Sequence, residues 1–335
     1  MSAIAAAPFA EAGDVGGLAS TQSRAVAATE WIERLHAEVT GLFVALDRGG
    51  AFFEDVWTRP GGGGGVTRVL MDGTTFEKAG VNRSAVSGEL PAAAAAKLGG
   101  RAHDGRPSTF FATGLSVVVH PRSPRVPTIH LNVRYFELAD HTGEIRDAWF
   151  GGGTDLTPTY PSPDDARSFH RELRATCDAY HSTLYPRFKA RCDEYFRNVH
   201  RDGEARGVGG IFFDHIRPDE DASQLDADAL FNFAGDVGGV LSRAYVPIVE
   251  RRRNAPYGYR ERALQLTRRA RYAEFNLLHD RGTLFGLQTG ARTESVLMSL
   301  PPMVQWTYSP SGPDDALAAA LTAMLVPRDW ASEDD

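Results

Sequence analysis

Three side chains able to do chemistry alternate with apolar ones in residues 128–137 of this 335-residue sequence. The alternation is typical of a β-strand, and it places His130, Asn132 and Arg134 on one face. An imidazole can move a proton, and a guanidinium binds a carboxylate through two parallel hydrogen bonds that a neighbouring amide can support. The segment therefore indicates proton transfer beside a bound carboxylate, although the solvated face of a two-layer sheet would look the same.

A second strand-like segment, residues 109–120, precedes the first. Its Ser116, Val118 and His120 also share one face. The connection HPRSPRVP contains prolines that prevent regular strand pairing there. If the two segments pair as a hairpin, both polar rows line one pocket.

An aspartate, Asp155, follows a triple glycine in the segment WFGGGTDLTP. Glycines leave the backbone free of side chains, so they could present this carboxylate to a ligand. Aspartate is also a common turn former and helix cap. The sequence alone leaves both interpretations open.

Two further motifs give weaker signals of ligand binding. Arg292 follows a small-residue turn in LQTGAR and could be an anion clamp or part of a surface hairpin. The run Gly61–Gly65 lacks the GK[ST] of a phosphate-binding loop and does not open a helix, so we reject phosphate binding. It suits a wide turn, a flexible loop, or close approach of the backbone to a flat ligand.

Four histidines are candidate metal ligands, but their spacing is not that of a metal motif. None forms HxxxH, HExxH or a Cys/His cluster. Separate structural or catalytic roles explain them equally well. The four are His120, His130, His170 and His200.

Composition excludes several classes of protein. A net charge of −7 argues against general nucleic-acid binding. No apolar run approaches the roughly 20 residues that span a bilayer, and the start of the chain lacks the basic region of a signal peptide. Cys177 and Cys192 belong to no CxxC pair, which favours reduced, buried thiols. We therefore expect a cytoplasmic protein with no integral membrane segment.

The periodicity of apolar residues indicates an α+β fold that combines a mainly antiparallel sheet with helices. Residues 1–20 are expected to be a flexible N-terminal segment, and residues 21–335 a single domain. Helices are expected at 21–47, 91–97, 163–201 with a break near Tyr185, 222–251, 260–271 and 314–326. Strands are expected at 109–120, 128–137 and 208–213, on both sides of the glycine run, and in the successive segments RYAEFNLL, GTLFGLQT and SVLMSL.

These segments together resemble the oxygen-dependent coproporphyrinogen III oxidase family. The resemblance rests on long motifs in a fixed order, RPGGGGGVTRVL, FFATGLSVVVHPRSPRVPTIHLNVRYFEL, WFGGGTDLTPTY, GVGGIFFD and RRARYAEFNLLHDRGTLFGLQTGARTESVLMSLPP. It covers residues from about 25 to 331. It implies a large, flat, mainly antiparallel sheet sandwiched between helices, a site between sheet and helices, and a homodimer formed through about residues 272–307.

The resemblance also implies roles for individual residues. The family's proton donor falls on His130, and an aspartate that hydrogen-bonds the pyrrole N–H groups falls on Asp155. The substrate-binding positions fall on Ser116, Asn132, Val133, Arg134, Gly290, Ala291 and Arg292. The metal ligands proposed for bacterial members fall on His120, His130, His170 and His200. Two departures stand out, because Ala291 replaces a usual glycine and Asp214-His215 stands where two acids are common.

The implied reaction converts the propionates on rings A and B of coproporphyrinogen III to vinyl groups, giving protoporphyrinogen IX in haem biosynthesis. Dioxygen is the oxidant and no organic cofactor is required, in line with the lack of a dinucleotide motif in the sequence. His130, Asp155 and Arg134 would be catalytic, with Arg134 and Asn132 holding a reacting propionate and Arg292 another. The sequence leaves open whether a divalent metal is used. Two other classes stay open, a non-catalytic porphyrin or haem carrier and a His-ligated metal-dependent oxygenase.

Overall fold

Seven strands form one antiparallel sheet in the computed structural model, which describes residues 23–91, 108–218, 224–288, 291–308 and 315–333. The strand order is β1-β2-β3-β4-β5-β6-β9, so the first six strands lie side by side in chain order. They are β1 (Phe52–Thr58), β2 (Gly63–Met71), β3 (Phe76–Leu90), β4 (Ser108–Pro121), β5 (Thr128–Ala139), β6 (Ile145–Thr157) and β9 (Gly209–Ile216). Two short strands, β7 (Arg197–Asn198) and β8 (Glu204–Ala205), pair separately.

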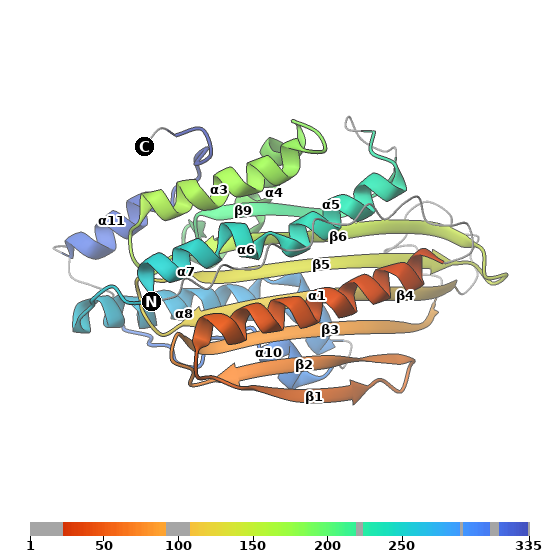
Figure 1. Cartoon of the computed structure of the whole chain (residues 1–335), viewed down its shortest axis with the longest axis horizontal. Coiled ribbons are helices and arrows are strands. Elements are labelled where there is room, and N and C mark those ends of the chain that lie inside the picture. The colour runs from red at the N-terminus through yellow and green to blue at the C-terminus, as the bar shows by residue number, and fades with distance from the viewer. Residues whose placement is uncertain (1–22, 92–107, 219–223, 289–290, 309–314, 334–335) are drawn as a thin grey trace, which may run out of the picture.

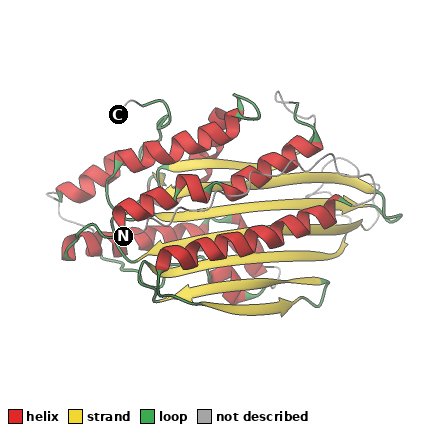
Figure 2. Ribbon diagram, viewed as in Figure 1, coloured by secondary structure: helices red, strands yellow, loops and turns green. Residues whose placement is uncertain are grey.

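Helices cover both faces of the sheet (Figures 1 and 2). The near face in Figure 1 carries α1 (Arg24–Asp47), α3 (Pro163–Asp178), α5 (Ala227–Gly239), α6 (Leu241–Ala244) and α7 (Val246–Arg252). Behind the sheet lie α8 (Tyr259–Leu278) and α10 (Thr293–Leu297). The other helical segments are α4 (Leu184–Tyr195), which packs against β9, the short turn η1 (Val199–Arg201), α9 (Arg281–Gln288) and α11 (Ala316–Met324). In the part of the chain that the structure describes, no helix has the length and apolar character needed to cross a membrane.

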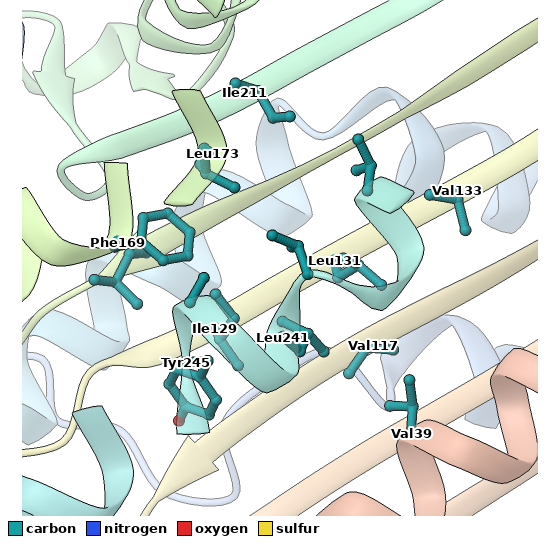
Figure 3. Packing of buried hydrophobic residues seen from close by; sticks show 14 of the residues in the cluster. Val39, Val117, Ile129, Leu131, Val133, Phe169, Leu173, Ile211, Leu241 and Tyr245 are labelled. Carbon is teal, nitrogen blue, oxygen red and sulfur yellow. The ribbon is translucent and has the colours of Figure 1, made fainter. Parts of the chain in front are cut away.

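The larger core lies between the sheet and the near-face helices. Ile129, Leu131 and Val133 of β5 are fully buried and alternate with polar residues. They belong to one apolar cluster with Val39 of α1 (Figure 3). This alternation fixes the register, because a slip by one residue would carry His130 into the core.

A buried carboxylate joins the end of α1 to the turn between β2 and β3. Asp47, the last residue of α1, is fully buried. Its oxygens accept backbone N–H bonds from Gly50 at 2.7 Å, Thr74 at 3.0 Å, Thr75 at 2.9 Å and Phe76 at 2.8 Å. All four donors are main-chain groups, so this carboxylate holds the backbone at the corner.

Most of the expected elements are confirmed. The α+β class, the antiparallel sheet, the first helix and the three strands expected at 109–120, 128–137 and 208–213 agree within a few residues with the structure. The break between α3 and α4 falls just before Tyr185. The glycine run makes the turn into β2, where Gly62 and Gly63 have φ angles of 114° and 83°, which glycine adopts readily. Almost all of the helix expected at 91–97, and residues 1–20, lie outside the described residues, and the extent of the domain stays a prediction.

The three strands expected between residues 271 and 300 are wrong. The segment is helical, because α8 continues to Leu278 and is followed by α9 and α10. The buried side of α8 includes Gln265, Arg268 and Arg269. These polar residues interrupt the apolar period of the helix, so the apolar stretch that follows looks like a separate strand. Arg269 is neutralised in the fold by Glu77 at 2.7 Å, a contact that the local sequence does not signal.

Candidate functional site

The polar faces of two neighbouring strands form one surface. β4 and β5 pair antiparallel, with Ser116 opposite Asn132 and Val118 opposite His130. Opposite residues in such a pair share a face, so the predicted hairpin and its common polar face are confirmed. Asp155 of β6 lies opposite His130 and adds its carboxylate to the same surface. This is the face that α8 covers, away from the larger core.

His130, Asp155 and Arg206 form a chain of charged and polar groups. His130 Nδ1 lies 2.9 Å from Asp155 Oδ1, and Arg206 Nη2 lies 2.5 and 2.6 Å from the two Asp155 oxygens. An ionised carboxylate only accepts hydrogen bonds, so Nδ1 carries the hydrogen and Nε2 is left for a ligand. The side chain of His130 is 22% exposed and that of Asp155 only 1%, so the imidazole is the open end of the chain.

Aromatic rings enclose Arg206, which lies between β8 and β9. Its guanidinium carbon is 3.9 Å from the ring centre of Phe196, 4.6 Å from that of Tyr272 and 4.9 Å from that of Phe275. Its Nη1 donates to Asn276 of α8 at 3.0 Å. Nothing in the sequence singled out this residue, since the only local signal is the GVGG segment that follows it and allows close packing.

The paired charges keep Asp155 ionised although it is buried. Burial alone would raise the pKa of Asp155, but the Arg206 guanidinium and the His130 imidazole hold it below its usual range. Burial would likewise lower the pKa of Arg206, and the Asp155 carboxylate raises it instead. Asp155 is only 1% exposed, and both of its oxygens already accept from Arg206. Its contacts favour orientation of His130, and the ring-binding role stays a prediction.

Arg134 is half-buried and paired across the sheet. Its Nη2 lies 2.7 Å from Asp214 Oδ1 on β9, and its Nη1 donates to Asn132 Oδ1 at 3.4 Å. Burial alone would raise the pKa of Asp214, but His215 and Arg134 hold it below its usual range. Gly151 makes room for the pair, because a Cβ there would lie 2.7 Å from Arg134 Nε and 2.9 Å from Asp214 Oδ1. The first glycine of the triple thus clears space for these two side chains.

The other expected substrate positions are not all on this surface. The Val133 side chain is fully buried in the larger core, so only its backbone can meet a ligand on the site face. Ala291 and Arg292 are exposed, and Arg292 Nη2 lies 2.5 Å from Asp55 on the edge strand β1. Gly290 lies outside the described residues.

Two of the four candidate metal ligands are buried and fully bonded. His120 Nε2 lies 2.9 Å from the Ser299 carbonyl, and its Nδ1 lies 3.3 Å from a threonine hydroxyl. His170 Nδ1 lies 3.0 Å from Tyr185 Oη, and its Nε2 lies 3.0 Å from the Val208 carbonyl. Burial lowers the pKa of His170 to about 3 and that of His120 well below its usual range, so both are neutral.

The third candidate ligand outside the site, His200, belongs to a separate cluster. Its Nδ1 lies 2.8 Å from His279 Nε2, and its Nε2 lies 3.2 Å from Glu274 Oε2. Among the described residues, no group of three or more His, Cys, Asp or Glu side chains is arranged to hold a metal ion. A metal ligand needs a free nitrogen lone pair, so the four histidines do not fit one common metal site.

Comparison with known proteins gives a consistent match. The family described as coproporphyrinogen III oxidase matches residues 27–330. The chain is 50% identical over 305 residues to the "Oxygen-dependent coproporphyrinogen-III oxidase" of Drosophila melanogaster, covering 89% of this chain and 76% of that protein. It is 47% identical over 293 residues to the "Oxygen-dependent coproporphyrinogen-III oxidase, chloroplastic" of Glycine max, covering 85% and 74%. The cytoplasmic location expected for this chain stays a prediction.

Proposed function

This chain belongs to the coproporphyrinogen III oxidase family, and we propose that it catalyses the oxygen-dependent oxidative decarboxylation of coproporphyrinogen III. The propionates on rings A and B become vinyl groups, and the product is protoporphyrinogen IX, an intermediate of haem biosynthesis. The observation that carries the proposal is the row of His130, Asn132 and Arg134, partly exposed beside the buried carboxylate of Asp155.

Each conversion balances with one dioxygen. A –CH2CH2COOH side chain and O2 give –CH=CH2, CO2 and H2O2. The hydrogen on the carbon next to the ring leaves with its electron pair, which reduces oxygen, and the pair from the broken C–C bond to the carboxyl group forms the new double bond. The pyrrole nitrogen stabilises the cation in between, so this electron flow needs no organic cofactor.

The side chains of the site have separate tasks in this reaction. Arg134 and Asn132 bind the carboxylate of the reacting propionate, and Asp214 fixes the plane of the guanidinium. His130 supplies through Nε2 the proton that converts the hydroperoxide anion to H2O2, and Asp155 orients its ring. Positioning supplies much of the rate, because an electron-rich porphyrinogen reacts readily with oxygen.

The direct test is to incubate the purified protein with coproporphyrinogen III with and without dioxygen. We expect vinyl product and peroxide in equal amounts when oxygen is present, and a start of the reaction when oxygen is readmitted to an anaerobic sample. Conversion that is equally fast without oxygen would contradict the proposal. Tight binding without product would instead identify a porphyrin carrier.

A lysine substitution tests whether Arg134 binds the carboxylate. Arg134→Lys keeps the charge but loses the planar fork, so we expect activity to fall by more than about tenfold, roughly 1.4 kcal/mol of transition-state stabilisation. Arg83→Lys is the matched control, because Arg83 lies on the opposite face and pairs with Glu33 at 2.9 Å. Equal activity of the two variants would remove Arg134 from the site. Arg292→Lys, compared in the same way, tests whether Arg292 anchors another propionate.

The assembly that we propose is a homodimer formed through about residues 272–307. Exposed large apolar side chains gather in this stretch and suit an interface; they are Leu277, Leu278, Leu287, Met303 and Trp306. Phe275, in contrast, is buried within the chain in a cluster with Cys192 and Phe196. Light scattering at micromolar concentration should report twice the mass of one chain, and a monomer would count against the dimer.

No metal takes part in the proposed steps. The electron and proton balance closes without one, and both ring nitrogens of His120 and His170 already have partners. We expect the protein to keep substantial activity after metal removal verified by elemental analysis. Activity that is abolished and then restored by one divalent ion would support the metal-dependent oxygenase instead.

A further inference from the structure

A row of polar side chains runs across four neighbouring strands of the site face. Thr67 of β2 lies opposite Asn82 of β3, Asn82 opposite Ser116 of β4, and Ser116 opposite Asn132 of β5. Opposite residues share a face, so all four point to the side of the sheet that carries His130. Neighbouring strands are about 4.8 Å apart, so the row extends about 10 Å from Asn132 to Asn82. Figure 1 shows these strands side by side.

The amide of Asn82 has a fixed orientation. Thr67 Oγ1 donates to Asn82 Oδ1 at 2.8 Å and accepts a bond from Trp57 Nε1 at 3.2 Å. Ser295 Oγ of α10 lies 2.7 Å from the same hydroxyl, and it is the donor, because the single hydrogen of Thr67 already serves Asn82. The Asn82 oxygen is therefore held on the β2 side. No hydrogen bond among the described residues uses its NH2 group.

The rest of the row also presents donors. The Oδ1 of Asn132 accepts a bond from Arg134 at 3.4 Å, which leaves its NH2 group for a ligand. The hydroxyl of Ser116 has no partner within the described part of the chain. Asn82, Ser116 and Asn132 are all half-buried. Two NH2 groups and a hydroxyl in one row suit an acceptor with two oxygens, such as a carboxylate.

The next row of side chains along these strands, at Gly80 and Val118, is covered by other residues of the chain. In that row Val118 is buried, and a Cβ at Gly80 would lie 3.0 Å from Met298 Sδ. The residues that follow α10 therefore cover the sheet as far as Gly80. The row of Asn82 and Ser116 is the next one along these strands, and there the side chains become accessible.

We propose that Asn82, next to the substrate-binding position expected at Ser116, completes a second carboxylate subsite beside Asn132 and Arg134, for a propionate that the reaction does not consume. The inference rests on the proposed function, because a substrate with four propionates presents another carboxylate near the reacting one. The subsite holds its ligand by hydrogen bonds alone. Thr67 is a positioning residue, since its bond keeps the donor end of Asn82 turned toward the ligand.

Two substitutions at one position separate a binding role from a structural one. Asn82→Asp keeps the oxygen that accepts from Thr67 but replaces the free NH2 group with a charged oxygen that repels a carboxylate. Asn82→Leu removes both the accepting oxygen and the donating NH2 group without adding charge. We expect the KM for coproporphyrinogen III to rise more than about tenfold for Asn82→Asp and about fivefold for Asn82→Leu, with kcat within about twofold of wild type. A purely structural role predicts the reverse order, since only Leu breaks the bond from Thr67.

Substrate analogues identify the group that is bound. Two porphyrinogens are used, in which an ethyl group replaces the propionate of ring C or of ring D. For wild type, one of them should raise KM about fivefold, and for Asn82→Leu the same analogue should cause no further rise. Equal penalties for wild type and variant with both analogues would overturn the subsite.

Controls keep this result separate from the main proposal. Arg83→Ala perturbs the same strand from the opposite face and should keep the wild-type KM. Thr67→Val removes the hydroxyl that orients Asn82 and should raise KM. Thermal melts confirm folding of every variant. A wild-type protein without turnover in air would overturn the proposed function together with the subsite, whereas an active wild type with an unchanged KM in both Asn82 variants would overturn the subsite alone.

Discussion

Two polar groups on the near face, Asp47 and His170, are stabilised differently from the His130, Asp155 and Arg206 group on the α8 face. On the near face, Asp47 is held by four backbone N–H groups, and His170 by a tyrosine hydroxyl and a backbone carbonyl. On the α8 face, His130, Asp155 and Arg206 hold one another through charge. Asp47 and His170 are fully buried, whereas the second group includes the partly exposed imidazole of His130.

The comparison shows that the type of a residue does not decide its role. An aspartate and a histidine occur on both faces, and all but His130 among them are almost fully buried. Neutral, fixed partners make Asp47 and His170 part of the scaffold. His130 has one nitrogen bonded to Asp155 and Nε2 left for a ligand, so it is suited to proton exchange, whereas both nitrogens of His170 are already bonded.

The largest effect is expected from removal of the cation on the α8 face. Arg206→Met leaves the Asp155 carboxylate buried without its counter-charge, and breaking a buried ion pair costs about 3–5 kcal/mol. Urea unfolding at neutral pH measures the loss. Arg206→Lys keeps the positive charge but lacks the planar guanidinium, so it should lose less unfolding free energy than Arg206→Met. A destabilisation below about 1 kcal/mol for Arg206→Met would mean that the pair contributes little to the fold.

The second effect tests the scaffold carboxylate. Asp47→Asn replaces one accepting oxygen with an NH2 group that faces backbone donors, so we expect a loss of about 3 kcal/mol in unfolding free energy. The kcat and KM of the folded variant should stay at wild-type values, since the partners of Asp47 are backbone groups at the corner after α1 and not site residues. A selective loss of kcat in a stable Asp47→Asn protein would break the comparison between the two faces.

The same substitution in the site should lower kcat as well as stability, because it also removes the counter-charge of the buried Arg206. Asp155→Asn keeps the size and one acceptor but removes the charge beside His130, so we expect kcat to fall more than about tenfold, roughly 1.4 kcal/mol, with KM little changed. Steady-state kinetics on a variant with a confirmed thermal melt provide the measurement. A folded variant within about twofold of the wild-type kcat, about 0.4 kcal/mol, would remove Asp155 from the catalytic residues.

The last prediction concerns acid stability. The pKa of His170 is about 3 in the fold, below the ordinary value of 6.5, so between these pH values the unfolded chain binds a proton that the native protein does not. Stability is therefore lost as the pH falls from 6.5 toward 3, by up to about 1.4 kcal/mol per pH unit for one proton. His170→Gln keeps a donor and an acceptor and should flatten this slope by about one proton. Urea unfolding at pH 7, 6, 5 and 4 measures how the unfolding free energy changes with pH. If this dependence is the same in wild type and His170→Gln, His170 is not the group responsible.

The sheet could be predicted from the sequence because alternation reports both the strand and its faces. The pattern around His130 gave the correct strand, the correct face and the partner strand of Ser116. The helices after residue 271 could not be predicted in the same way. The side of α8 that faces the sheet includes arginines, and their neutralisation by Glu77 and Glu204 depends on contacts between distant segments.

The candidate site was predicted only in part for a similar reason. His130 and Asp155 have local signals, an alternating strand and a glycine run. Arg206 and Asn82 have none, since the importance of each arises from a partner in another element of the fold. The buried bonds of His120 and His170 were equally invisible, because a histidine in a sequence does not reveal its partners.

The order of the strands has a consequence for how the protein is made. β1 to β6 lie side by side in chain order, so a growing chain can pair them one after another as it leaves the ribosome. The cation that neutralises Asp155 follows only at residue 206, and α8 is complete only at Leu278. At about 5–20 residues per second, the roughly 120 residues after β6 take about 6–24 seconds to synthesise. During that interval α8 does not yet cover the site face, so the candidate site is completed well after the strands that carry it.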